Sequence, residues 1–147
     1  MFKITDGKKN PKSFMATRNA RKEFQRGIRY GLHEVGRDNL LFLRKILDQP
    51  NKHGRWYFIH GKWHRASAPY EAPAKLTGKL LNSTAYKVRT HHSLEIGDQM
   101  YYGKFLEKGT VKMEPRPHLK TMERFKRRKN VNTLQDSVYS RINRAKK

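Results

Sequence analysis

The chain carries seven histidines, and their spacing is a first test for metal chemistry. His60 and His64 lie four positions apart, which would suit two zinc ligands on one helical turn. The residues around them predict a β-hairpin instead, so the two rings need not converge. His91 and His92 are adjacent, and neighbours on a strand point to opposite faces. We therefore expect neither a metal site nor a cofactor.

The chain offers few residues in the patterns that covalent or acid–base catalysis needs. The chain has no cysteine, and no serine stands in a Gly-x-Ser-x-Gly turn. The phosphate-loop spacing of glycine and lysine is also missing. Carboxylates that could work as a pair are scarce among the twelve acidic residues. The sequence predicts a protein that is not an enzyme.

The most constrained stretch is residues 101–119, with the sequence YYGKFLEKGTVKMEPRPHL. Three of its apolar side chains fit one face of a short helical turn: Tyr102, Phe105 and Leu106. Gly109 and Thr110 then end that turn. A sequence with such opposed local preferences predicts a defined structure rather than a plain loop.

An acid and two prolines complete this stretch. Pro115 and Pro117 bracket Arg116 and force an extended backbone, because each fixes its own φ and restricts the preceding residue. Glu107 is an acid in a very basic chain, and we expect it to pair with a basic residue, with Arg116 as the candidate. That pair could lock the turn inside one subunit or join two subunits, and the sequence favours neither.

A long helix should position the rest of the fold. It begins near residues 13–19 and ends near Asp48, because apolar residues follow a helical period and Pro50 stops it. Gly27, Gly31 and Gly36 weaken this helix or let another backbone approach closely. A kinked core helix is the favoured interpretation.

The remaining elements follow from turn signals and alternation. Residues 55–66 predict a β-hairpin that turns at 60–62, and Thr77 is expected to cap a short helix ending at Leu81. Residues 84–90 alternate as a half-buried strand, with residues 94–96 as the antiparallel partner. Two helices are expected at the end, one from His118 to about Lys129 and one carrying Leu134, Val138 and Ile142.

Together these elements predict an α+β fold, a small and mainly antiparallel sheet packed against one long helix. The expected organisation is a basic N-terminal arm (1–14), one α+β domain (15–125) and a basic C-terminal helical extension (126–147). No apolar run approaches the roughly 18 residues that span a bilayer, so we expect a soluble protein without membrane contact.

The strongest compositional signal is charge, with 34 basic residues against 12 acidic ones and a net charge of +22. Self-repulsion of that size favours a polyanionic partner, usually nucleic acid bound through its phosphates. A merely solvated basic surface and an acidic protein partner remain alternatives. The charge gathers at both ends, which gives these candidate phosphate contacts: Lys8, Lys9, Lys12, Arg124, Arg127, Arg128 and Lys129.

Aromatic residues gather in the predicted hairpin beside three basic ones. Bases could stack on these rings: Trp56, Tyr57, Phe58 and Trp63. A sheet core with a protein interface on its other face is the favoured interpretation, because a small core does not easily bury two tryptophans within eight residues.

Two ordered blocks of the sequence resemble a known family. The first is HRASAPYEAPA at residues 64–74, followed by TGKLLNS at 77–83; the second is residues 101–119. Their order and spacing resemble the small neck, head–tail joining or tail-completion proteins of tailed bacteriophages. Tyr70 stands where that pattern has Gly, and His118 stands where it has an aromatic or apolar residue.

The resemblance implies a structural virion protein at the capsid–tail junction. It implies a homo-oligomeric ring, most often sixfold with twelvefold possible, which touches portal-side and tail-side proteins and has viral DNA in its lumen. The residues it singles out for the fold or for subunit contacts are Tyr102, Phe105, Glu107, Gly109, Thr110, Arg116 and Pro117. The alternative from charge alone is a stand-alone nucleic-acid-binding protein.

Overall fold

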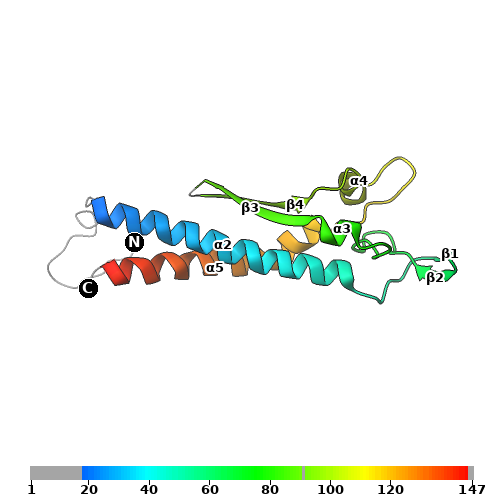
Figure 1. The fold of residues 1–147 in the computed structure, drawn as a ribbon, viewed down its shortest axis with the longest axis horizontal. Coiled ribbons are helices and arrows are strands. Elements are labelled where there is room, and N and C mark those ends of the chain that lie inside the picture. The colour runs from blue at the N-terminus through cyan, green and yellow to red at the C-terminus, as the bar shows by residue number, and fades with distance from the viewer. Residues whose placement is uncertain (1–17, 91, 146–147) are drawn as a thin grey trace.

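The structure is a computed structural model that describes residues 18–90 and 92–145. Two long helices, α2 (Arg18–Asp48) and α5 (Leu119–Ala145), lie side by side and run antiparallel along the length of the molecule (Figure 1). Two small antiparallel sheets of two strands each complete the fold. The predicted α+β class is confirmed.

Glycines on α2 line the contact between the two long helices. A Cβ at Gly27 would lie 3.0 Å from the Cα of Val138, and a Cβ at Gly31 would lie 3.0 Å from the Cβ of Ser137. Since real Cβ contacts are rarely so short, these glycines let the backbone of α5 approach closely. The favoured reading of a kinked core helix therefore gives way to the close-approach alternative.

The C-terminal region is one continuous helix of 27 residues, so the prediction of two helices was wrong. The physical reason is visible in the sequence, because residues 119–145 contain neither glycine nor proline to break the helix. Residues 126–145, expected as an extension, lie along α2, and Lys126 Nζ contacts Asp38 Oδ2 at 2.8 Å.

The hydrophobic core is small and lies toward the C-terminal end of α2. It consists of Leu43, Ile46 and Leu47 from α2 with Met122 from α5. Side chains from the other elements pack against it: Phe42, Ala72, Leu80, Leu81, Ile96 and Leu119. The core therefore joins the start of α5 to the loops and strands above α2.

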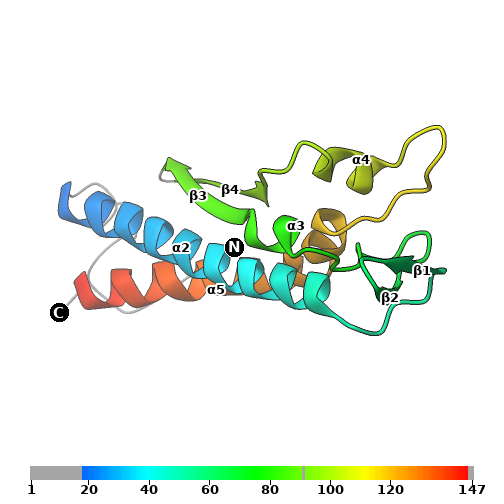
Figure 2. The same cartoon turned by 45° about the vertical axis from the view of Figure 1, so that its right-hand side comes forward.

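Strands β3 (Thr84–Thr90) and β4 (Ser93–Asp98) pair antiparallel and pack against α2 (Figures 1 and 2). Alternate residues of β3 are more buried, as predicted. Arg44 of α2 fixes the start of the strand, since its Nε donates to Thr84 Oγ1 at 3.2 Å. A Cβ at Gly36 would clash with the Tyr86 ring, so only glycine at this position lets β3 pack closely on α2.

Strands β1 (Trp56–Ile59) and β2 (Lys62–Arg65) form the predicted hairpin as a separate sheet at one end of the molecule (Figure 2). The expectation of one sheet was thus too simple. His60 and Gly61 make the turn with φ of 50° and 76°, the left-handed values that two-residue hairpin loops need. Lys62 already belongs to the strand.

The two short helices lie close to their predicted positions. Helix α3 (Lys79–Asn82) follows Gly78 with φ 76°, and the Thr77 hydroxyl accepts a hydrogen bond from the Lys79 backbone N–H at 3.4 Å, as expected. Helix α4 (Gly103–Lys108) ends at Gly109, whose φ of 77° stops the helix as expected. Within the described residues, no helix is long and apolar enough to span a bilayer.

Candidate functional site

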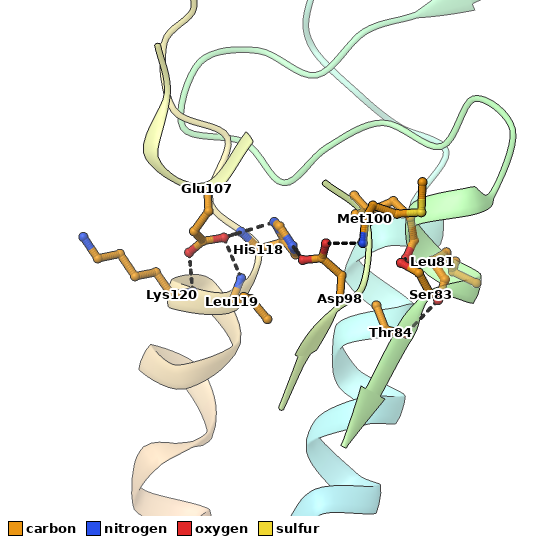
Figure 3. Close-up of polar contacts among 10 residues, drawn as sticks. Leu81, Ser83, Thr84, Asp98, Met100, Glu107, His118, Leu119 and Lys120 are labelled. Carbon is orange, nitrogen blue, oxygen red and sulfur yellow. Dashed lines mark hydrogen bonds and ion pairs between the residues drawn. The ribbon is translucent and has the colours of Figure 1, made fainter. Parts of the chain in front are cut away.

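Glu107, near the end of α4, holds the beginning of α5. Its carboxylate accepts hydrogen bonds from the backbone N–H groups of His118 at 2.8 Å, Leu119 at 3.0 Å and Lys120 at 2.8 Å (Figure 3). The first N–H groups of a helix have no partner within the helix, and the helix dipole favours an anion there. A side chain from a distant segment therefore caps α5.

His118 lies between two carboxylates, and we call Asp98, Glu107 and His118 the His118 cluster. Its Nε2 lies 3.0 Å from Asp98 Oδ2, and its Nδ1 lies 3.0 Å from Glu107 Oε2 (Figure 3). The Nδ1 contact is an ion pair rather than an aligned hydrogen bond. The imidazole is fully buried, at 0% exposure.

The two carboxylates decide the charge of this ring. Burial alone would lower the pKa of His118, but the contacts with Glu107 and Asp98 outweigh burial and raise that pKa above its usual value. Burial would likewise raise the pKa of Glu107, whereas His118 and the three backbone N–H groups lower it to about 2. A protonated imidazole beside an ionised Glu107 is the form that this geometry stabilises.

The predicted partner of Glu107 was wrong, since the carboxylate pairs with His118 and not with Arg116. The contact lies within one chain, so it corresponds to the alternative in which Glu107 stabilises the turn inside one subunit. Both imidazole nitrogens face carboxylates and the ring is sealed from solvent, which leaves it unable to reach a substrate. No three His, Asp or Glu side chains of the described residues are placed to hold a metal ion.

The two sequence blocks meet in space through Tyr70. Its backbone N–H donates to Pro115 O at 2.8 Å, and its hydroxyl donates to Glu114 at 3.2 Å. Tyr70 has φ 62°, a left-handed value that favours glycine, which is the residue of the family pattern at this position.

Arg116 joins the segment before α5 to α4 through its backbone N–H, and its Nε takes no part in this contact. Its N–H donates to Leu106 O at 2.6 Å, while its Nε is buried without a hydrogen-bond partner among the described residues. The side chain lines a pocket of about 310 Å³ between the β1–β2 hairpin, residues 66–81 and α4. Tyr102 and Leu106 line the same pocket.

The other predicted motif residues shape the backbone or lie at the surface. Phe105 is 43% exposed, whereas Tyr102 and Leu106 are partly buried. Thr110 forms an isolated bridge with Met113, and the Pro117 carbonyl accepts a hydrogen bond from the Thr121 hydroxyl. These residues thus define the turn between α4 and α5.

The hairpin exposes one aromatic face. Trp56 pairs with Arg65 and Phe58 with Trp63, and paired residues share a face of the sheet. The exposures of Trp56, Phe58 and Trp63 are 59%, 62% and 67%, and we call these three side chains the aromatic face. Among the described residues, nothing buries the aromatic face, so this face of the hairpin is not part of a sheet core.

Four exposed basic residues lie along one side of α5, and we call them the basic row: Lys120, Arg124, Arg127 and Arg128. Their spacing of four, three and one places them on one helical face. Lys129 differs, since its Nζ contacts Asp38 at 3.2 Å. The other candidate phosphate contacts, Lys8, Lys9 and Lys12, lie outside the described residues.

Sequence reasoning missed several residues of this region. His118 stood out only as a departure from the resembled pattern, and nothing in the sequence indicated that Asp98 would reach its ring. Comparison of the chain with models of protein families, with curated proteins and with solved structures finds no match.

Proposed function

We propose that this protein is a structural subunit of a virion, which forms a ring at the junction of capsid and tail. The family proposal comes from the two sequence blocks described above. Their joining through Tyr70 and Pro115 supports reading them as one functional unit. The proposed partners are further copies of the chain, portal-side and tail-side proteins, and viral DNA in the lumen.

The observation that carries an assembly role is the aromatic face. A two-stranded hairpin is marginal in water by itself, and contiguous exposed apolar side chains mark interaction sites. Trp56, Phe58 and Trp63 present such a surface at the end of an elongated molecule (Figure 1). A protein contact that buries this face would stabilise both the hairpin and an assembly.

Contact with DNA is supported by the basic row. Arg124, Arg127 and Arg128 are exposed and make no ion pair with the described acidic side chains. Unpaired cations on one helix face can neutralise phosphates without reading bases. This predicts weak and strongly salt-dependent attraction to DNA of any sequence, as a ring lumen requires.

The mass of the purified full-length protein in solution and electron microscopy of its particles test this proposal. A sixfold or twelvefold ring is the expected result. A triple variant that replaces Trp56, Phe58 and Trp63 with serine should remain folded by circular dichroism but lose the assembly. A chain that stays monomeric alone and beside its neck partners contradicts the proposal.

The second candidate function is a stand-alone nucleic-acid-binding protein, which the basic row also favours. Such a protein should bind a preferred sequence with nanomolar-range affinity at physiological salt. A monomer bound tightly to one DNA sequence would replace the ring proposal.

A further inference from the structure

Two residues that line the pocket beside α4 each have a buried polar atom without a hydrogen-bond partner among the described residues. Ser67 is only 2% exposed and its Oγ has no hydrogen-bond partner among the described residues, as is true of Arg116 Nε. Both residues line the pocket. A buried donor without an acceptor destabilises a fold, so an occupant of this pocket that supplies an acceptor would stabilise both side chains.

The rest of the pocket wall selects what kind of group can enter. Apolar side chains make up much of the wall, among them Leu47, Tyr57, Leu81 and Leu106. Its charged residues are all basic, namely Arg65, Lys75, Lys79 and Arg116. A ligand that fits this wall combines an apolar body with a negative charge.

We propose that this pocket binds a partner protein's acidic segment, in which an apolar side chain stands beside a carboxylate. The carboxylate would accept hydrogen bonds from the Arg116 guanidinium and the Ser67 hydroxyl, and the apolar side chain would lie against Tyr57 and Leu106. This assignment is independent of the ring, since it needs only one subunit and one segment.

The surroundings of the pocket favour a chain segment over a small molecule. Tyr57 and Leu76 line the pocket and are each 50% exposed, so its apolar wall continues onto the surface. An occupant that extends out of the pocket covers this rim, whereas an enclosed small acid leaves it exposed.

Charge argues that the partner is not a second copy of this chain. The pocket wall carries Arg65, Lys79 and Arg116, beside Lys75, which already pairs with Asp48, so this pocket repels a basic segment of another copy. A different protein with an acidic surface is attracted by the same charges.

Titration of full-length protein with short peptides, followed by amide NMR shifts, tests the proposal. The probe is acetyl-Leu-Glu-Phe-amide, and its matched control is acetyl-Leu-Gln-Phe-amide. We expect shifts at Tyr57, Ser67 and Arg116, with affinity for the Glu peptide at least about tenfold higher because its hydrogen bonds are charge-assisted. Equal affinities, or shifts confined to the basic row, would overturn the proposal.

Two variants separate binding from folding. Arg116→Gln should weaken binding of the Glu peptide about tenfold without lowering the midpoint of urea unfolding, because Nε has no partner to lose. Ser67→Ala should act in the same direction, and Arg127→Gln is the control outside the pocket. Unchanged peptide affinity in both pocket variants contradicts the assignment.

A small acid completes the test. Phenylpropionate carries an apolar ring and a carboxylate but no chain on either side. Weaker binding than that of the Glu peptide is expected, because it leaves the rim uncovered. Affinity equal to that of the peptide would assign the pocket to small organic acids instead of a protein segment.

Discussion

The carboxylate of Glu107 holds both the ring and the backbone of His118. Oε2 lies 3.0 Å from Nδ1 and 2.8 Å from the backbone nitrogen of the same residue. One acid therefore closes the turn between α4 and α5, caps the helix that packs along α2, and sets the charge of a buried ring. The acid that first stood out in the sequence stabilises the fold within one chain.

Removing this carboxylate should be among the most damaging single changes. Glu107→Ala leaves a buried imidazolium with one carboxylate and three helix N–H groups without an acceptor, so we expect a loss of about 3–5 kcal/mol in the free energy of unfolding. Urea unfolding measures the loss. Glu95→Ala, which removes a 59% exposed carboxylate paired with Arg89, should stay within about 0.5 kcal/mol. Similar losses in the two variants would contradict the central role of Glu107.

Stability should depend on pH at both ends of a window set by the His118 cluster. Because the fold lowers the pKa of Glu107 from 4.5 to about 2, its contribution is complete above pH 4.5 and is lost as pH falls through 2, at most about 3 kcal/mol. Because the fold raises the pKa of His118 above 6.5, its contribution is complete below pH 6.5 and is lost as pH rises through the raised value.

Urea midpoints measured across pH for the wild type and for Glu107→Gln check this window. The difference between the two proteins should be greatest between pH 4.5 and 6.5 and should shrink toward either side. Parallel pH profiles would mean that other groups set the pH dependence.

Local signals in the sequence were enough for most elements, but not for the contacts between them. The span of α2, the hairpin at Trp56 and the stop at Gly109 follow from periodicity and turn residues within a few positions. The pairing of Glu107 with His118 spans eleven residues and depends on how the chain turns back between α4 and α5, which no local pattern specifies. Arg116, the partner predicted from the sequence, lines the pocket instead.

The same limit applies to the glycines of α2, whose role depends on a helix a hundred residues further along the chain. An exposed Gly→Ala change in a helix stabilises it by up to about 1 kcal/mol. Gly31→Ala should instead destabilise the protein by about 1–3 kcal/mol, because the new Cβ lies 3.0 Å from Ser137 Cβ. Thermal or urea unfolding distinguishes the two signs. Gly97→Ala is the control, since a Cβ there meets nothing within 4 Å.

Tyr70 should tolerate glycine unusually well. Its φ of 62° strains any residue with a Cβ by about 1–2 kcal/mol, and a β-branched side chain fits this region least well. We therefore expect Tyr70→Gly to unfold near the wild-type urea midpoint and Tyr70→Val to unfold well below it. Matching changes at the exposed Tyr101 should show no advantage for glycine. An equal loss for both Tyr70 variants would mean that the hydrogen bond to Glu114 outweighs the backbone strain.

The basic row should set how steeply DNA binding falls with salt. Each phosphate contact contributes a slope of about −0.9 in a plot of log affinity against log salt. Replacing Arg124, Arg127 and Arg128 with glutamine should therefore make the slope shallower by about 2 to 3, measured by fluorescence anisotropy on duplexes of two unrelated sequences. Lys129→Gln is the matched control, because its ammonium already contacts Asp38 and should contribute less. If the slope changes equally in Lys129→Gln and in the triple variant, the phosphate contacts lie elsewhere on the protein. If the triple variant loses affinity for only one of the two duplexes, the basic row recognises the base sequence. That result would support the stand-alone DNA-binding function.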